Sequence, residues 1–363
     1  MTDTDYMQEA LRIAENAKGR TSPNPLVGAV IVKDDRIIAE GWHRQAGTPH
    51  AEIHALNMAG ELAKGATLYV TLEPCSHFGR TPPCANAIVE AGIKKVVVAM
   101  SDPNPKVAGR GFQILKDAGI EVEVGLCEAE ARTLNEVFIK WVTTGKPFVT
   151  LKTAMSLDGK IATATGQSKW ITSEVSRQRV HELRDINDAI MVGIETVLKD
   201  NPMLTTRIDN GKNPIRIVVD SKARTPLASN VVTNHQTKTI IAVTDNAPKE
   251  RVNALKKSGI EIIFAGDGER VDLNILMNEL AKREITSVLL EGGGTLNFGM
   301  IEANLIDKVY AFIAPKIIGG RSALTPVEGN GFDSLKNAVM LKDVTTELID
   351  NDILIIGYVD KER

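Results

Sequence analysis

Hydrophobic positions in the first 145 residues follow two spacings, one typical of helices and the other of strands. Apolar residues at helical spacing predict an amphipathic helix over residues 4–18. Two β-branched runs on either side of Asp34-Asp35 predict a hairpin. Further helices are predicted at Ala51–Ala59, Ala85–Ala91, Gly111–Ala118 and Glu128–Val142, and strands at Val27–Val32, Arg36–Gly41, Thr67–Thr71, Lys95–Met100 and Ile120–Val124. This order predicts three layers, with helices on both faces of a mixed sheet.

The remainder of the chain alternates short apolar runs with helical patterns, which is typical of an α/β sheet. A loop is expected between Gly193 and Pro202. The last two strands have no long helix between them, so they are expected to pair antiparallel. Strands are predicted from Phe148 and at Ala189–Gly193, Ile215–Asp220, Thr239–Val243, Ile260–Phe264, Ser287–Glu291, Lys308–Ile313 and Asp352–Tyr358, and helices at 174–185, about 249–258, about 271–283 and through Ile301.

A boundary between two domains is predicted at Thr143–Pro147. There a helical pattern ends, Gly and Pro interrupt the chain, and a new strand begins at Phe148. The cut gives domains of residues 1–145 and 146–363. A chain of 363 residues exceeds the usual size of one domain, which supports this division.

Composition limits the classes of protein to which the chain can belong. A hydrophobic content of 43% with 25% charged residues is ordinary for a globular protein. The polar, acidic start predicts no signal peptide, and no apolar run is long enough for a membrane span. A formal net charge of −3 argues against a nucleic-acid-binding protein, which would carry a basic face. Three cysteines suggest no disulfide framework and predict a cytoplasmic protein.

Two short segments together carry the side chains of a catalytic zinc site. Glu52 follows His50 by two residues, and Cys75 and Cys84 flank a segment rich in proline and glycine. Three protein ligands leave the fourth zinc position open for water, as in catalytic sites. The proton of that water needs an acceptor, and we assign this role to Glu52. His-x-Glu followed by Pro-Cys and a second Cys is the pattern of zinc deaminases.

The spacing of the two cysteines departs from most zinc deaminases, because eight residues lie between them instead of two. Pro83 precedes Cys84 and Pro49 precedes His50, and proline is favoured at or just before the first helical turn. Two helices are therefore expected to begin at one site, where their dipoles favour a thiolate. The alternative is a chance His-x-Glu together with small buried cysteines, which requires both halves to coincide by chance.

Other polar residues near these segments have two interpretations each. Cys127 is interpreted as a small buried hydrophobe. His54 is assigned to helix packing or to the edge of the substrate, and His43 and His77 to contacts around the metal site or with substrate. Asn24 lies between two prolines, so it is either a turn former or an amide that binds substrate.

The second half carries weaker signals for a phosphate-containing ligand. A glycine-rich turn at 292–297 joins a strand to a helix N-terminus and presents N–H groups to a phosphate, although a tight turn without a ligand fits equally well. Ser221–Arg224 follows a strand with hydroxyl and cationic groups, which suits the 2′-phosphate of NADPH; an ordinary basic loop is the alternative. Arg184 and Arg207 are either surface charges or phosphate ligands.

With these residues in view, nearly all 363 residues resemble the family of bifunctional riboflavin-biosynthesis deaminase/reductases. The wide cysteine spacing fits this family. The markers are Asn24–Val30, His50–His54, Val70–Cys84, Asp102–Pro105, Ser156–Lys160, Trp170–Ser173, Asp200–Pro202, Leu290–Gly294 and Ala314–Lys316. The resemblance implies a cytidine-deaminase-like zinc domain followed by a dihydrofolate-reductase-like NADPH domain, and a homo-oligomer formed through the latter.

The resemblance also implies two successive reactions on small molecules. The first is zinc-dependent hydrolytic deamination of 2,5-diamino-6-(5-phosphoribosylamino)pyrimidin-4(3H)-one. The second is NADPH-dependent reduction of the ribosyl group of 5-amino-6-(5-phosphoribosylamino)uracil to ribityl. Neither reaction involves a nucleic acid or a membrane.

Site residues follow from the resemblance, position by position. At the first site Asn24, His43, His77 and Arg80 are candidates for holding the ring and phosphate. At the second, the cofactor is expected against Ala154, Trp170, Thr196, Asp200, Ser221, Gly293, Gly294, Thr295, Leu296, Asn297, Phe298 and Gly299. The substrate is expected against Ser168, Arg184, Leu204, Arg207 and Glu291. Lys152, Asp200 and Glu291 are unranked candidates for the proton donor.

Two other hypotheses share part of this pattern. A nucleic-acid cytidine or adenosine deaminase with a C-terminal RNA-binding half would share the zinc motif, but the net charge of −3 and 4% aromatic residues supply neither a phosphate clamp nor a stacking surface. A zinc-stabilised scaffold without activity would share the ligands. Glu52 argues against it, because a structural zinc site needs no adjacent carboxylate.

Overall fold

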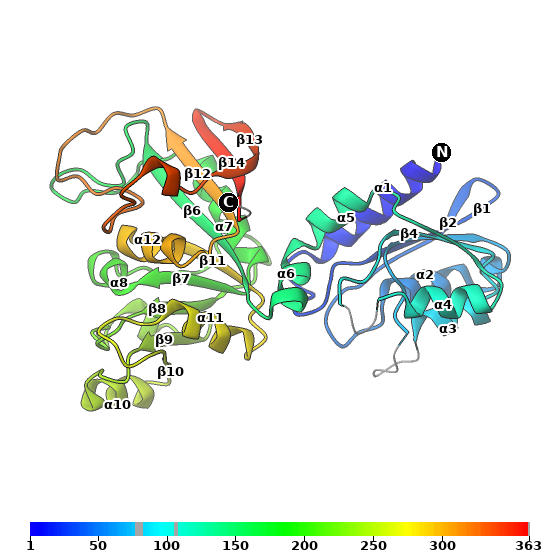
Figure 1. Cartoon of the computed structure of the whole chain (residues 1–363), viewed down its shortest axis with the longest axis horizontal. Coiled ribbons are helices and arrows are strands. Elements are labelled where there is room, and N and C mark those ends of the chain that lie inside the picture. The colour runs from blue at the N-terminus through cyan, green and yellow to red at the C-terminus, as the bar shows by residue number, and fades with distance from the viewer. Residues whose placement is uncertain (77–82, 105–107, 362–363) are drawn as a thin grey trace. The chain divides into compact units, whose positions relative to one another are not determined.

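The computed structural model describes residues 1–76, 83–104 and 108–361. The chain divides into two compact units, Met1–Gly145 and Lys146–Arg363 (Figure 1). Each unit has its own sheet and its own hydrophobic core. Among the described residues, no helix is both long enough and apolar enough to cross a membrane.

The first unit is built on a five-stranded sheet in the order β2-β1-β3-β4-β5. β1 pairs antiparallel with β2 and β3, whereas β3, β4 and β5 run parallel, so the expected mixed sheet is confirmed. The strands are β1 (Gly28–Lys33), β2 (Arg36–Trp42), β3 (Thr67–Leu72), β4 (Lys95–Met100) and β5 (Glu121–Val124).

Helices cover both faces of this sheet (Figure 1). They are α1 (Asp3–Ala14), α2 (Ala51–Ala59), α3 (Cys84–Glu90), α4 (Arg110–Asp117), α5 (Glu128–Leu134) and α6 (Glu136–Thr144), with 3₁₀ turns at Glu15–Ala17 and Gly60–Ala63. α1 and α5 lie on one face, and α2, α3 and α4 on the other. α1 begins with a capping box, in which Thr2 and Asp5 each accept a hydrogen bond from the other's backbone N–H.

The single helix expected over Glu128–Val142 is wrong, because it is broken at Asn135 into α5 and α6. The Asn135 side chain is buried and holds the distant loop before β1: it accepts from Leu26 N at 2.8 Å and donates to Leu26 O at 2.9 Å. This partner lies 109 residues away in sequence, so helical periodicity carries no sign of the break.

The second unit is built on a nine-stranded sheet in the order β10-β9-β8-β7-β11-β6-β12-β14-β13. The seven strands from β10 to β12 run parallel, and β14 and β13 continue antiparallel, which confirms the expected antiparallel pairing of β12 and β14. The strands are β6 (Phe148–Ser156), β7 (Ala189–Gly193), β8 (Ile215–Val219), β9 (Thr239–Val243), β10 (Glu261–Phe264), β11 (Ser287–Gly292), β12 (Lys308–Ala314), β13 (Leu341–Ile349) and β14 (Asp352–Val359).

The central strands of this sheet are buried on both faces. Along β7, Ala189 and Met191 join one core cluster, whereas Ile190 and Val192 join the other. Continuous apolar runs are typical of parallel strands covered by helices on both sides. The helices are α7 (Glu174–Ile186), α8 (Ile194–Asp200), α9 (Asn230–Thr233), α10 (Lys249–Lys257), α11 (Leu273–Ala281) and α12 (Gly294–Glu302), with a 3₁₀ turn at Leu335–Asn337.

Several elements of the second unit differ from the expectation, among them α8 and β13; the short helix α9 and the 3₁₀ turn Leu335–Asn337 were not predicted either. The segment after Gly193 forms the two-turn helix α8 instead of a loop, since only Ile194 and Val197 are buried and one apolar pair is a weak helical pattern. β13 was not predicted from the sequence, because all but its two end residues are exposed. Neither face of the strand needs apolar residues, so the sequence shows no alternating pattern. Backbone pairing with β14 holds β13 in place.

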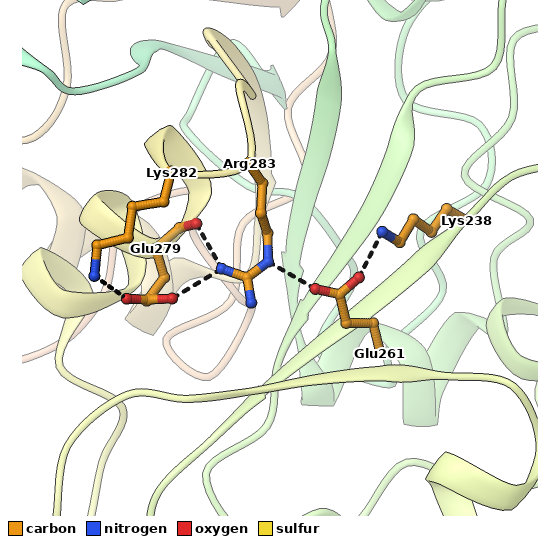
Figure 2. Close-up of polar contacts among 5 residues, drawn as sticks. All are labelled: Lys238, Glu261, Glu279, Lys282 and Arg283. Carbon is orange, nitrogen blue, oxygen red and sulfur yellow. Dashed lines mark hydrogen bonds and ion pairs between the residues drawn. The ribbon is translucent and has the colours of Figure 1, made fainter.

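A surface network of ion pairs connects β10, the edge strand of this sheet, to residues at the end of α11 and just before β9 (Figure 2). Glu261, the first residue of β10, pairs with Lys238 at 2.5 Å and with Arg283 at 2.6 Å. Arg283 also pairs with Glu279 of α11, which in turn pairs with Lys282. An isolated exposed pair contributes little stability, but here one arginine joins two carboxylates from different elements.

Candidate active sites

The three expected metal ligands converge in the first unit. His50 Nδ1 lies 3.2 Å from Cys84 Sγ and 3.5 Å from Cys75 Sγ, and the three ligand atoms lie within 4.8 Å of one another. His50 caps α2, Cys84 is the first residue of α3, and Cys75 follows β3. Tetrahedral zinc with sulfur and nitrogen ligands would place them about 3.5 Å apart, so this donor set fits zinc.

The two thiols share one proton in this arrangement. The hydrogen bond from the Cys84 thiol lowers the pKa of Cys75 to about 4, and the same bond raises the pKa of Cys84. The backbone N–H of Cys84 also donates to Cys75 Sγ at 3.2 Å. Cys75 is therefore ready to act as a thiolate, and a cation bound between the two would remove the remaining proton.

Glu52 lies on the first turn of α2 and is buried, with 3% of its surface exposed. Burial raises the pKa of its carboxyl to about 7, and the neighbouring Cys75 adds to the rise. A carboxyl with a pKa near neutrality can both accept and return a proton at physiological pH, which is the requirement for a general acid–base group.

Asn24 and His43 form one hydrogen-bonded unit beside the ligands. Asn24 Nδ2 lies 3.1 Å from His43 Nε2, and His43 Nδ1 lies 3.2 Å from Pro49 O. Because burial lowers the pKa of His43, its neutral ring donates through Nδ1 to Pro49 O and accepts from Asn24 through Nε2. His43 therefore orients the Asn24 amide, and its ring also packs edge-on against that of His50.

The remaining candidates of the first site have different outcomes. His77 and Arg80 lie outside the described residues. His54 faces Gly41 of β2, where an added Cβ would come within 2.8 Å of the His54 Cβ, which supports the helix-packing interpretation. Cys127 is half-buried and packs against the core of the first unit.

In the second unit, the topology gathers the candidate residues at one edge of the sheet. β8, β7, β11, β6 and β12 are parallel neighbours, so their carboxyl ends lie together. Ala154, Thr196, Ser221 and the turn from Gly293 all lie at or just after these ends. Ligands of open α/β sheets bind at this edge.

Glu291 is placed by a β-bulge in β11. The pairing with β7 shifts between Leu290 and Gly292, so Glu291 is the extra residue. Bulges near active sites re-aim side chains. Here the carboxylate receives two hydrogen bonds from Arg184 of α7, at 2.6 and 2.9 Å, and Lys152 Nζ of β6 lies 3.8 Å away.

Charge compensation sets the protonation state of this cluster. Burial alone would raise the pKa of Glu291, but Arg184 and Lys152 lower it to about 2. Burial lowers the pKa of Lys152, and Glu291 opposes this change. His181, one turn before Arg184, was not anticipated from the sequence; burial and the cations Arg184 and Arg207 lower its pKa to about 4.

The glycine-rich turn holds part of the expected cofactor set together. Gly292 and Gly293 have φ values of 107° and 33°, which only glycine adopts readily. An added Cβ on Gly293 would lie 3.7 Å from Thr196 Oγ1, so α8 lies against this turn. Asn297 and Phe298 are buried instead of facing outward: Asn297 donates to Pro326 O at 2.7 Å, and Phe298 contacts the Phe332 ring.

Trp170 is 61% exposed, and Arg177 and Lys316 contact it. The Arg177 guanidinium lies over its ring at 4.4 Å, and Lys316 Nζ donates to the carbonyls of Trp170 and Ile171. Arg177 carried no signal in the sequence, whereas Lys316 belonged to a family marker. Ser168, two residues before Trp170, is half-buried.

The last candidates lie on loops around the edge. The Ser221 hydroxyl accepts from Val271 N at 3.1 Å, and Arg224 pairs with Glu195 at 2.6 Å. Leu204 is buried in the core with φ 52°, so its side chain is not available to a ligand. Arg207 and Asp200 are exposed, as are Thr295 and, in part, Gly299 and Leu296.

Comparison with known proteins decides the family. Residues 147–355 match the RibD C-terminal domain, and residues 1–100 match the zinc-binding region of cytidine and deoxycytidylate deaminases. The chain is 48% identical over 358 residues to the riboflavin biosynthesis protein RibD of Actinobacillus pleuropneumoniae, covering 98% of this chain and 95% of that protein. The chain belongs to the RibD family.

Solved RibD structures agree in fold over the whole chain. RibD of Acinetobacter baumannii has a TM-score of 0.89, 42% identity and 99% coverage of both chains. A diaminohydroxyphosphoribosylaminopyrimidine deaminase/5-amino-6-(5-phosphoribosylamino)uracil reductase of Thermotoga maritima has a TM-score of 0.87, 39% identity and 98% coverage of both. This RibD-family chain is therefore a bifunctional deaminase and reductase of riboflavin biosynthesis. The expected fold is confirmed, and the RNA-binding and inactive-scaffold hypotheses are not supported.

Proposed function

We propose that the unit of residues 1–145 deaminates 2,5-diamino-6-(5-phosphoribosylamino)pyrimidin-4(3H)-one and that the unit of residues 146–363 reduces the ribosyl group of the product to ribityl with NADPH. The observation that supports this proposal most strongly is that His50, Cys75 and Cys84 converge beside the buried Glu52. The name of the Thermotoga maritima relative, a diaminohydroxyphosphoribosylaminopyrimidine deaminase and 5-amino-6-(5-phosphoribosylamino)uracil reductase, supports the choice of substrates.

At the first site, His50, Cys75 and Cys84 would hold zinc, which lowers the pKa of a bound water towards neutrality. Glu52 accepts the proton that the attacking water loses and returns it to the exocyclic amine, which leaves as ammonia. The Asn24 amide, fixed by His43, faces the pyrimidine ring, and His77 and Arg80 contact the ring or the phosphate.

At the second site, the carboxyl ends of the parallel strands would hold the cofactor, and the turn Gly293–Gly299 would offer N–H groups to its phosphates. Ala154, Trp170, Thr196, Asp200 and Ser221 complete its surroundings. Lys222 and Arg224, which follow Ser221 at the end of β8, favour the 2′-phosphate of NADPH over the free hydroxyl of NADH.

When bound, NADPH would supply hydride to the sugar carbon of the ring-opened imine, and a residue of the chain would have to supply a proton to the imine nitrogen. Arg207, Ser168 and the backbone of Leu204 surround the substrate and its phosphate. Arg184 has three N–H groups bound to Glu291 and Thr205 O, so it acts mainly by fixing Glu291. Lys152 lies 3.8 Å from the Glu291 carboxylate and is the candidate proton donor, whereas the exposed Asp200 has no such partner cluster among the described contacts.

A paired assay tests this assignment. Ammonia release and NADPH absorbance are followed together on the diaminopyrimidinone phosphate with wild type, Cys84→Ser and Arg207→Ala. We expect Cys84→Ser to lose ammonia release but to reduce the added deaminated intermediate, and Arg207→Ala to do the reverse. If NADPH is oxidised by none of the three, the proposed reaction of the second unit is wrong.

We further propose that the protein is cytoplasmic and forms a homo-oligomer. The three cysteines without a disulfide framework support the location, and the family resemblance supports the oligomer.

A further inference from the structure

A buried carboxylate outside the ligand set lies next to the first site. Glu73 directly follows β3, is only 6% exposed, and is separated from Cys75 by Pro74 alone. Its Oε2 accepts from Asp102 N at 3.2 Å and from Gly109 N at 3.0 Å, and its Oε1 accepts from Gly111 N at 3.0 Å. One side chain thus binds three backbone N–H groups, two on the segment between β4 and α4 and one in the first turn of α4.

The same segment touches the ligand-bearing backbone directly. An added Cβ on Gly111 would lie 2.0 Å from Pro74 O, so the absence of a side chain lets the first turn of α4 contact the residue before Cys75. The backbone of Glu73 is also fixed, because its N–H donates to Met100 O at the end of β4 at 3.0 Å.

The ligand segment is also held by α3. Ala85 N donates to Cys75 O at 3.2 Å, and Cys84 N donates to Cys75 Sγ at 3.2 Å. α3 and α4 pack against each other (Figure 1), so Cys75 lies on a short segment between two helix starts. The α3 side contains another ligand, Cys84. The α4 side is joined to the segment through Glu73 and Gly111.

We propose that Glu73 is a positioning residue that sets the place of Cys75 in the metal site by binding the first turn of α4 and the segment after β4 to the ligand-bearing backbone. A ligand held in place before the metal arrives loses less conformational freedom on binding, so fixing Cys75 raises metal affinity. A carboxylate is required because it only accepts hydrogen bonds, and a glutamine would turn a donor towards at least one of the three N–H groups.

The test compares Glu73→Gln with Glu90→Gln, an exposed glutamate at the end of α3. Zinc affinity is measured by competition with a chelator, and the site geometry by the visible absorption of the cobalt-substituted protein. We expect Glu73→Gln to weaken zinc binding about 10- to 100-fold, the range typical of groups that orient metal ligands. Its cobalt spectrum should change, whereas Glu90→Gln should match wild type.

Gly111→Ala perturbs the same segment in a second way and leaves the Glu73 carboxylate unchanged. Its methyl group must displace Pro74, so we expect weaker zinc binding and an altered cobalt spectrum here too. Circular dichroism and thermal unfolding report whether the variants are folded. If Glu73→Gln lowers thermal stability but leaves zinc affinity and the cobalt spectrum unchanged, Glu73 only stabilises the fold and the proposal is wrong. If Glu73→Gln does not fold, Gly111→Ala decides, and unchanged zinc binding there overturns the proposal.

The inference rests on the proposed metal site, and the two can fail separately. Wild type that binds no zinc under these conditions contradicts the site itself. Wild type that binds zinc, with both variants equal to it, contradicts only the role of Glu73.

Discussion

Glu52 and Glu291 are both buried glutamates, and their surroundings move their pKa values in opposite directions. Around Glu52 burial dominates, and the pKa rises to about 7. Around Glu291 burial is outweighed by Arg184 and Lys152, and the pKa falls to about 2. One carboxyl can exchange a proton at neutral pH, whereas the other stays ionised and anchors two cations.

Glu52→Gln tests the first of these roles. Removing the proton acceptor while keeping the shape of the side chain should lower the deaminase kcat at least 100-fold, the lower end of the usual contribution of general acid–base catalysis. Ammonia release measures this. Zinc content and reductase activity of the same protein should remain at wild-type levels, and a variant that still deaminates at the wild-type rate would rule out the proton transfer by Glu52.

Acid titration tests the second role. A carboxyl whose pKa is depressed in the folded state stabilises the fold above its unfolded pKa, and this stability is lost as the pH falls through the folded pKa. For Glu291 the window runs from about pH 4.5 down to about 2, and the contribution at neutral pH is on the order of 3 kcal/mol. Glu291→Gln should therefore be less stable at pH 7 and lose less stability across this window.

Urea unfolding at a series of pH values measures this difference. In a Trp42→Phe, Trp141→Phe background, Trp170 is the only tryptophan and reports on the second unit alone. Glu302→Gln, on the last turn of α12, is the control. If the free energy of unfolding of wild type and of Glu291→Gln changes by the same amount between pH 5 and pH 2, the pKa assigned to Glu291 is wrong.

At the scale of elements, α7 connects the two polar clusters of the second unit. Arg177, His181 and Arg184 recur at spacings of four and three residues, so they share one face of the helix. Arg177 stacks on Trp170, and Arg184 binds Glu291. The position of α7 therefore sets both the exposed Trp170 ring, which is expected at the cofactor, and the Glu291 carboxylate, which is expected at the substrate.

Arg177→Gln should weaken NADPH binding by loosening Trp170. An exposed cation–π contact contributes about 0.5–1 kcal/mol, so the expected change in Kd is roughly 2- to 5-fold. Energy transfer from Trp170 to bound NADPH measures it in the single-tryptophan background. Arg179→Gln, on the same helix but paired with Glu182, should bind as wild type. Equal affinities for the two variants would show that Trp170 needs no support from Arg177.

At the scale of the whole molecule, each candidate site is contained in one unit. The ligands and Glu52 lie within Met1–Gly145, whereas Lys152, Arg184 and Glu291 lie within Lys146–Arg363. Each unit also has a sheet and core of its own, which are the requirements for independent folding.

Separate expression of the two units tests this independence. We expect residues 1–145 to release ammonia from the first substrate and residues 146–363 to oxidise NADPH with the second, because no residue of either described cluster comes from the other unit. The full chain is the reference for both rates. A unit that folds, as judged by circular dichroism, but loses its reaction would show that its site needs the other unit.

The sequence by itself determined most elements, the mixed sheet and the α/β sheet, and that His50, Cys75 and Cys84 come together. These depend on local periodicity, on helix starts after proline, and on ligand chemistry that is specific to residue type. The break at Asn135, the strand β13 and the Arg184–Glu291 pair were decided only by the tertiary structure. Asn135 bonds to a loop 109 residues away, β13 is held by backbone pairing, and Glu291 reaches Arg184 through a bulge set by its neighbours. Each depends on contacts between distant segments, which leave no pattern in the local sequence.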